Sequence, residues 1–258
     1  MADKLLEIKG VSKIFRVGGM IRGKKLVAVD DVTLSIDNDK PVILSVVGES
    51  GCGKSTFGRT LIQLHKATAG SVTFDGKDLF SLKGAELKKA KKDVQMVFQD
   101  PLSSFSPRMK VGTYLMESRR NFDGISKENG LKEARKLLLE VGLPEDFVNR
   151  YPHELSGGQL QRVAIARAIS IQPKLLICDE ATGALDVSIQ NQIAKLLVKL
   201  VEEKQISCLF IGHDLALVRS VSQRIAVMYL GNLVETLPGA ELSSKAMHPY
   251  TKALMGAV

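Results

Sequence analysis

Short apolar runs alternate with segments of helical spacing along most of this 258-residue chain. The apolar runs predict buried strands over residues 42–47, 94–98, 175–178, 207–211 and 224–228. Apolar positions three or four residues apart predict amphipathic helices after residue 56, between residues 111 and 143, after residue 159 and over residues 188–201. Strands that alternate with helices in this way indicate an α/β fold with a mostly parallel sheet covered on both faces.

Two parts of the chain depart from this alternation. At the N-terminus, residues 5–9 and 27–36 are predicted to be antiparallel strands joined by a glycine-containing loop over residues 17–25. A strand at residues 71–74 follows and ends in Asp75-Gly76, a typical hairpin turn. Helical periodicity dominates residues 100–165, which we expect to form an inserted α-helical subdomain.

Several side chains are expected to form the apolar faces of these helices. The helix after residue 56 is predicted to place Phe57, Leu61 and Leu64 on one stripe. The face expected in the helical insertion comprises Leu131, Ala134, Leu138 and Val141. We expect one domain over residues 1–240 and a tail over residues 241–258.

Composition narrows the class of protein. The chain is 45% hydrophobic and 25% charged, which is ordinary for a globular protein. No apolar stretch approaches the roughly 20 residues needed to cross a bilayer, and the first residues lack a secretory apolar region, so we expect a soluble, non-secreted chain. Three cysteines without C-x-x-C spacing favour neither a disulfide framework nor a zinc site, and they fit a reducing cytoplasm.

The formal net charge of +8 permits binding to nucleic acid or to an anionic membrane surface. No aromatic residue for base stacking is interleaved with the densest basic cluster, so a solvated face explains it more simply. This cluster comprises Lys83, Lys88, Lys89, Lys91 and Lys92.

A glycine-rich loop follows residues 42–47 and fits the phosphate-binding pattern G-x-x-x-x-G-K-[ST] in full. This phosphate loop comprises Gly48, Glu49, Ser50, Gly51, Cys52, Gly53, Lys54, Ser55 and Thr56. Its glycines allow backbone N–H groups to converge on phosphate oxygens at the positive end of the following helix. Lys54 is predicted to reach the β- and γ-phosphates and Ser55 to give its hydroxyl to Mg²⁺. The sequence therefore predicts a nucleoside triphosphate site rather than a chance glycine-lysine turn.

Two adjacent carboxylates, Asp179 and Glu180, close the apolar run of residues 175–178. Ligands gather at the carboxyl ends of parallel strands, and a buried acid pair is costly without a cation. Asp179 is therefore predicted to join the Mg²⁺ shell, and Glu180 to activate the attacking water.

A second glycine-rich segment begins another predicted helix. This signature segment, Leu155-Ser156-Gly157-Gly158-Gln159, offers Ser156 as the N-cap and leaves N–H groups free for an anion. Alone it is an ordinary helix start. Between the two motifs above it closely resembles the signature sequence of ATP-binding cassette (ABC) proteins. The resemblance extends over nearly the whole chain and implies a P-loop NTPase (RecA-like) core with ATPase activity and with ATP and Mg²⁺ as cofactors.

The resemblance implies roles for four further residues. Phe15 would stack on adenine, and Gln99 would contact Mg²⁺ and the attacking water. Asp186, in Ala184-Leu185-Asp186, would lie at a dimer seam, and His213 would touch the γ-phosphate. Gln99 and His213 thus join Glu180 as expected catalytic residues.

Plainer explanations remain open for some of these positions. Phe15 is also explained as a core residue, and His213-Asp214 as a metal ligand or a His–carboxylate pair, although four scattered histidines form no ligand cluster. Gly183 stands where the family often has serine, and we expect activity to survive this difference.

The family resemblance also implies that two chains build each site. The charge of a transferring γ-phosphoryl group is spread over several oxygens, so one loop cannot surround it. The phosphate loop of one subunit would therefore be closed by the signature segment of another. The nucleotide-binding residues expected from this second side are Ser156, Gly157, Gly158, Gln159 and Asp186.

Three stretches narrow the resemblance to the ATPase subunits of dipeptide, oligopeptide and nickel importers. They are residues 98–109, residues 179–188 and the tail around His248-Pro249-Tyr250, where Pro249 also suits the first turn of a short helix. Such subunits imply two transmembrane permease subunits, an extracytoplasmic solute-binding protein and a homodimer or a heterodimer with a second ABC ATPase. They also imply a peripheral location on the cytoplasmic face of the cell membrane and no nucleic acid partner.

Two alternatives belong to other classes of the same family. A soluble cassette that acts on nucleic acid or ribosomes would fit the basic charge, but such proteins usually carry two cassettes or a long coiled-coil insertion. An exporter or lipoprotein-release ATPase is disfavoured by the His-Pro-Tyr tail.

Overall fold

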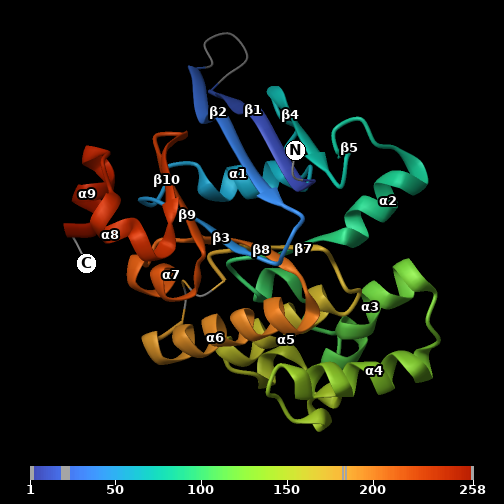
Figure 1. Ribbon diagram of the computed structural model, residues 1–258. Helices are drawn as coiled ribbons and strands as arrows, with labels where there is room; N and C mark the ends of the chain where they lie inside the picture. Colours follow the sequence, from blue (N-terminus) through green and yellow to red (C-terminus); the bar gives the residue numbers. More distant parts are fainter. Residues whose placement is uncertain (1–2, 19–23, 182, 184, 257–258) are drawn as a thin grey trace.

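Two β-sheets lie one above the other with helix α1 between them in the computed structural model, which describes residues 3–18, 24–181, 183 and 185–256 (Figure 1). The larger sheet has the order β10-β9-β3-β8-β7-β6, and all its neighbours are parallel except β9 and β10. Its strands are β3 (Ile43–Val47), β6 (Val94–Val97), β7 (Leu175–Asp179), β8 (Ser207–Gly212), β9 (Arg224–Tyr229) and β10 (Asn232–Pro238).

The N-terminal sheet is antiparallel, as predicted, with the order β2-β1-β4-β5. Its strands are β1 (Lys4–Val17), β2 (Lys24–Asp37), β4 (Ala69–Phe74) and β5 (Lys77–Asp78). Asp75 and Gly76 both have positive φ in the β4–β5 turn, which confirms the predicted hairpin. Residues 19–23, in the middle of the predicted glycine-containing loop, lie outside the described residues.

Alternating side chains of the central strands fill two separate cores. In β3, Leu44 and Val46 face the N-terminal sheet and α1 (Lys54–Leu61), whereas Ile43 and Val47 face the helices on the other side. Because both faces of the sheet are covered, its strands are continuous apolar runs. This confirms the predicted α/β fold with a mostly parallel sheet.

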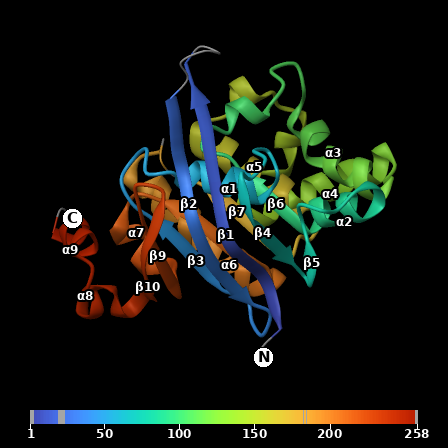
Figure 2. The same cartoon turned by 90° about the horizontal axis from the view of Figure 1, so that it is seen from above.

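Helices cover the second face and extend beyond it (Figures 1 and 2). The helices on this face are α3 (Val111–Asp123), α4 (Lys127–Glu140), α5 (Gly157–Ile169), α6 (Val187–Lys204) and α7 (Leu215–Val221). In contrast, α2 (Gly84–Asp93) packs through Ala90 into the core on the side of the N-terminal sheet, and α8 (Leu242–Lys245) and α9 (Pro249–Gly256) lie beside β10. Short 3-10 turns occur at Leu102–Ser104, Glu145–Asn149, Pro152–Glu154 and Gly239–Glu241. Within the described ranges, no helix has both the length and the apolar composition that crossing a membrane requires.

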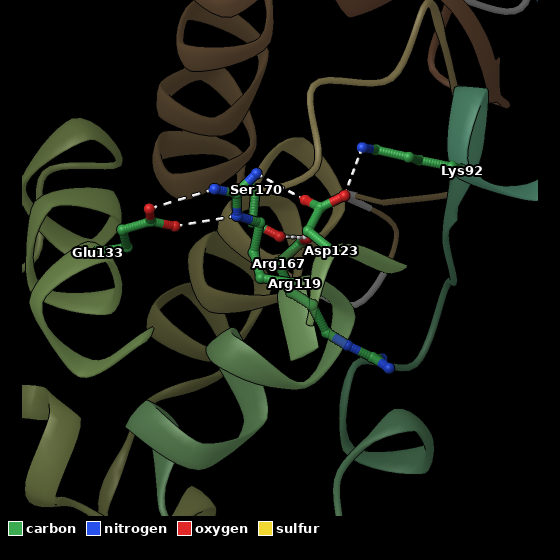
Figure 3. A network of polar contacts seen from close by, with 6 residues as sticks. All are labelled: Lys92, Arg119, Asp123, Glu133, Arg167 and Ser170. Atoms are coloured by element: carbon green, nitrogen blue, oxygen red, sulfur yellow. Dashed lines mark hydrogen bonds and ion pairs between the residues drawn. The ribbon is translucent and has the colours of Figure 1, made fainter. Parts of the chain in front are cut away.

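An ion-pair network joins α3 to α4 and to the end of α2 (Figure 3). The Arg119 guanidinium contacts Glu133 on α4 at 2.9 Å and Asp123 on α3 at 2.7 Å. Lys92 donates to the second oxygen of Asp123 at 2.5 Å. The helical segment is therefore tied to the sheet side of the molecule through charged side chains as well as through its apolar face, in which Ala134 and Leu138 are fully buried.

The predicted stripe of the first helix was wrong at its last position. Phe57 and Leu61 are buried, but α1 ends at Leu61 and the Leu64 side chain is 57% exposed. Gln63 has a left-handed backbone, with φ of 62°, and its amide donates to the Leu79 carbonyl. This contact with the residue after β5 accompanies the turn of the chain out of the helix before Leu64. The sequence analysis also did not predict α2, α7 or β10, whereas the helix that begins at Pro249 is confirmed.

Candidate nucleotide site

The predicted functional residues lie at the ends of different strands and converge at the carboxyl edge of the parallel sheet. The phosphate loop follows β3, Gln99 follows β6, Asp179 ends β7 and His213 follows β8. A cavity of about 460 Å³ opens there. Its walls comprise Phe15, Leu26, Val27, Ala28, Ser50, Gly51, Cys52, Gly53, Lys54, Ser55, Thr56, Gln99, Glu180, Leu230 and Gly231.

The phosphate loop lies against the backbone of β2 and β9, which explains why two of its positions are glycine. Gly53 has φ of 109°, and a Cβ there would lie 2.0 Å from the Ala28 carbonyl oxygen. At Gly48 a Cβ would lie 2.1 Å from the Met228 carbonyl oxygen. Any side chain at either position would collide with backbone, so glycine is required for the loop to keep this path.

Lys54 points back into the loop that carries it. Its side chain is buried, and Nζ donates to the carbonyl oxygens of Gly48 and Glu49, both at 2.8 Å. Burial raises the pKa of the neighbouring Cys52 thiol, so this cysteine stays neutral and leaves the positive charge of Lys54 uncompensated. The loop therefore presents an ammonium group and backbone N–H groups, a combination suited to phosphate.

Asp179 and Ser55 form an oxygen-rich corner beside the loop. The Asp179 carboxylate is fully buried, accepts a hydrogen bond from the Ser55 hydroxyl at 2.7 Å and lies 3.5 Å from the Arg59 guanidinium. Mg²⁺ prefers oxygen ligands and is usually held by one or two carboxylates together with substrate phosphates. These residues fit Mg²⁺, and the described part of the chain contains no cluster of three or more His, Cys, Asp or Glu side chains that would suit another metal.

Glu180 and Gln99 follow the neighbouring strands β7 and β6 and meet at the wall of the cavity. The Gln99 amide donates to the Glu180 carboxylate at 2.7 Å. Glu180 has a left-handed backbone, with φ of 45°, and its N–H donates to the Ile211 carbonyl of β8. The backbone of Glu180 is thus held by β8 and its carboxylate by Gln99, and the carboxylate remains at the cavity wall, where a water molecule can reach it.

His213 lies next to this carboxylate. A Cβ built on Gly183 would be 3.5 Å from His213 Cε1 and 3.6 Å from a carboxylate oxygen of Glu180, so both side chains lie beside Gly183. These are ordinary contact distances, and the position has room for a small side chain. Thr182 and Ala184, which flank Gly183 in the predicted family motif, lie outside the described residues.

Asp214 has a structural role that accounts for its place after His213. Its carboxylate accepts a hydrogen bond from the Leu217 N–H at 3.0 Å and so caps α7. The capping contact explains this carboxylate without a His–carboxylate catalytic pair.

The signature segment forms a second group outside the cavity. Ser156 and Gln159 make the predicted N-cap and a full capping box, with the Ser156 N–H donating to the Gln159 side chain at 2.9 Å. No residue of this segment is among the described residues that line the cavity. Within one chain the structure does not bring the two glycine-rich segments together.

Asp186 lies beside the signature segment rather than in the cavity. Its carboxylate caps α6 by accepting from the Ile189 N–H at 3.0 Å. A Cβ on Gly158 would be 2.6 Å from Ile189, and one on Gly157 would be 3.3 Å from Leu185. The start of α5 therefore packs against the start of α6, and both helix starts belong to one exposed surface.

Phe15 is half-buried on β1 and forms part of the cavity wall. Its ring meets His65 edge-to-face at 5.4 Å, and Lys13 Nζ lies 4.7 Å from its centroid. Partial burial, with Lys13 and Arg59 nearby, lowers the pKa of His65. The structure thus places Phe15 beside the predicted phosphate site and not in the closed core.

Sequence reasoning missed residues that touch the loop from distant parts of the chain. The Tyr250 hydroxyl accepts a hydrogen bond from the Glu49 N–H at 2.8 Å, and the Gly231 N–H donates to the Cys52 carbonyl at 2.9 Å. No local pattern signals either contact, although the His-Pro-Tyr tail had been singled out for its resemblance.

Comparison with known proteins gives consistent results. The family described as "ABC transporter" matches residues 29–183. The oligopeptide transport ATP-binding protein OppF of Salmonella typhimurium is 50% identical over 236 residues, which cover 91% of this chain and 70% of that protein. The oligopeptide transport ATP-binding protein AppF of Bacillus subtilis is 44% identical over 260 residues, covering 99% and 78%.

A solved structure agrees with the fold throughout most of the chain. It is the dimeric structure of a post-hydrolysis state of the ATP-binding cassette MJ0796 bound to ADP and Pi. The TM-score is 0.80 at 31% sequence identity, and the match covers 90% of this chain and 98% of that one.

Proposed function

Because this chain belongs to the ABC transporter family as an ATP-binding, ATP-hydrolysing subunit, we propose that it powers the import of oligopeptides across a membrane. The observation that carries the proposal is that Lys54 and Glu180 line one cavity, with the buried Asp179 bound to Ser55 of its wall, while the signature segment lies on a separate exposed surface. Such a site is complete only when a second cassette is added.

The phosphate loop binds the triphosphate in this proposal. Lys54 exchanges its carbonyl partners for phosphate oxygens, and the N–H groups of the loop and of α1 add further donors. Phe15, which also lines the cavity, offers its ring to the adenine base. Ser55 and Asp179 would hold Mg²⁺, which would offset the negative charge that develops on the phosphate oxygens.

Glu180 acts as the base for the attacking water. The Gln99 amide, which now donates to the Glu180 carboxylate at 2.7 Å, fixes the orientation of that carboxylate and can share the same water. His213, beside Gly183, supplies a polar contact to the γ-phosphate from the end of β8. Together these side chains favour in-line attack by one positioned water.

A second cassette closes the site. We propose that Ser156, Gly157 and Gly158 of one subunit, with Gln159 and Asp186 beside them, bind the nucleotide held by the loop of the other. Their exposed helix start provides free N–H groups and the positive end of α5. The related cassette with ADP and Pi is dimeric, which supports this arrangement. Loss of the γ-phosphate contacts then separates the subunits and converts hydrolysis into motion.

The permease subunits have a suitable docking position next to Gln99. A groove of about 320 Å³ is lined by residues 94–98 of the β6 segment and by side chains of α3 and α5, including Tyr114 and Arg167. Arg167 lies over the Tyr114 ring at 4.5 Å and pairs with Glu117 at 2.9 Å. A permease segment in this groove would move with Gln99 and so sense the nucleotide, at the cytoplasmic face of the membrane.

Oligopeptides are the proposed cargo because both relatives described above are oligopeptide transport proteins. Nickel, which the sequence resemblance left open, has no such support, and neither does a soluble cassette acting on nucleic acid. An extracytoplasmic solute-binding protein would deliver the peptide, and the partner cassette would be an identical chain or a second ABC ATPase.

The Glu180→Gln variant tests the proposal. Removing the base while keeping the shape of the side chain should lower phosphate release at least about 100-fold and leave ATP binding intact. The variant should then elute as an ATP-dependent dimer in gel filtration, whereas the exposed control Glu203→Gln should behave as wild type. Normal turnover in Glu180→Gln, or co-purification of the wild-type protein with RNA instead of membrane subunits, would contradict the proposal.

A further inference from the structure

The C-terminal tail is anchored to β10 by hydrogen bonds at its start. The Glu235 carboxylate on β10 accepts from the N–H groups of Met247 at 2.7 Å and of His248 at 3.3 Å. His248 Nδ1 in turn accepts from the Tyr250 N–H at 3.2 Å, and Pro249 occupies the first position of α9. These contacts set the direction of α9 where it leaves the edge of the sheet (Figure 2).

This direction brings Tyr250 to the phosphate loop. Its ring packs on Tyr229, the last residue of β9, with the centroids 4.2 Å apart. Its hydroxyl oxygen accepts the Glu49 N–H at 2.8 Å. Partial burial raises the pKa of Tyr250, so the hydroxyl is neutral at physiological pH and keeps this geometry.

Glu49 connects Tyr250 to the lysine of the loop. The N–H of Glu49 is bound by Tyr250, and its carbonyl oxygen accepts from Lys54 Nζ at 2.8 Å. At the other side of the loop, the Gly231 N–H holds the Cys52 carbonyl. These two contacts hold the backbone of the loop from outside, and one of them belongs to the tail.

We propose that Tyr250 is a positioning residue for ATP binding, through which the C-terminal tail sets the geometry of the phosphate loop. The inference rests on the nucleotide role proposed for that loop. Tyr250 does not touch the nucleotide; it fixes the Gly48–Glu49 peptide unit, whose carbonyl oxygen also accepts from Lys54, and thereby the starting position of Lys54. A loop that is already ordered loses less conformational entropy when it binds phosphate.

The experiment compares Tyr250→Phe with Tyr229→Phe in the full chain. Both variants keep the stacked rings, but only Tyr250→Phe removes an oxygen that holds the loop; within the described residues the Tyr229 hydroxyl has no hydrogen-bond partner. A fluorescent ATP analogue with Mg²⁺ measures the Kd, and phosphate release measures KM and kcat. We expect Tyr250→Phe to raise Kd and KM about 2- to 10-fold, as loss of one hydrogen bond implies, with kcat within about twofold of wild type. Tyr229→Phe should match wild type.

Hydrogen exchange gives an independent readout of the loop itself. In nucleotide-free Tyr250→Phe, the peptide that contains Glu49 should exchange faster than in wild type and in Tyr229→Phe. An unchanged Kd in Tyr250→Phe, or equal losses in both variants, would overturn the inference while ATP binding by the wild type leaves the proposed function standing. Absence of ATP binding by the wild type would overturn the proposed function as well.

Discussion

Replacing Asp179 by asparagine is expected to leave the stability of the nucleotide-free protein nearly unchanged and to remove the stabilisation that depends on Mg²⁺. The Asp179 carboxylate is fully buried, with the Ser55 hydroxyl at 2.7 Å and the Arg59 guanidinium only at 3.5 Å. Asparagine keeps an acceptor oxygen for Ser55 and removes a desolvated charge, which is costly to bury without close partners. Without nucleotide, the free energy of unfolding of the variant should be within about 1 kcal/mol of wild type or above it.

Addition of Mg-ATP should then show that the variant has lost its Mg²⁺-dependent rise in Tm. A ligand at 100 times its Kd stabilises the folded state by about 2.7 kcal/mol. For a protein of this size each kcal/mol raises Tm by about 2–4 °C, so wild type should gain about 5–10 °C. In Asp179→Asn, the Tm with Mg-ATP should equal the Tm with ATP and EDTA, because the carboxylate that holds the cation is gone.

Thermal unfolding of each protein alone, with ATP and EDTA, and with Mg-ATP is the assay. Asp214→Asn is the matched control, because Asp214 also follows a strand of the same sheet but caps α7, a role that asparagine fills equally well. An Mg²⁺-dependent rise in Asp179→Asn as large as in wild type would refute the assignment of Asp179. A loss of more than about 2 kcal/mol without ligand would refute the desolvation argument.

Three further predictions concern the phosphate loop and the ion-pair network of α3. Gly53→Ala should abolish ATP binding in a nucleotide titration, because its Cβ would meet the Ala28 carbonyl at 2.0 Å. Gly51→Ala, with no heavy atom within 4 Å of its Cβ, should cost only about 1–2 kcal/mol of stability from its positive φ. Equal effects of the two substitutions would contradict this explanation. Lys54→Ala should abolish measurable ATP binding, and wild-type affinity would refute its role. Arg119→Met should lower the urea-unfolding free energy by about 1–2 kcal/mol, while Lys132→Met, whose pair with Glu128 is exposed, should change it by less than about 0.5 kcal/mol.

Local patterns predicted those parts of the molecule that depend on neighbours in the sequence. The Ser156 N-cap involves residues three apart, and the helix start at Pro249 and the Asp75-Gly76 hairpin are equally local. Buried strands were found for the same reason, since each is an apolar run. The order of strand, loop and helix around Lys54 was therefore readable before any contact was known.

Leu64 shows where such patterns fail. Helical spacing predicted it on the buried stripe, but the Gln63 amide bonds to the Leu79 carbonyl and the helix ends first. Asp214 is a second case, because its role as a cap depends on where α7 begins. At Leu64 a tertiary contact outweighs a helix propensity that is worth only fractions of a kcal/mol per residue, whereas at Asp214 the capping contact is local and only the start of α7 was not predicted.

By itself, the sequence determined the chemical groups of the site and the elements that carry them, because motifs and periodicity are properties of adjacent residues. The tertiary structure alone decided that Gly53 must avoid the Ala28 carbonyl, that the signature segment lies away from the cavity of its own chain, and that Tyr250 holds Glu49. The last contact joins residues 201 positions apart. Contacts of that kind arise only when the whole chain packs, since no local hydrogen bond or spacing encodes them.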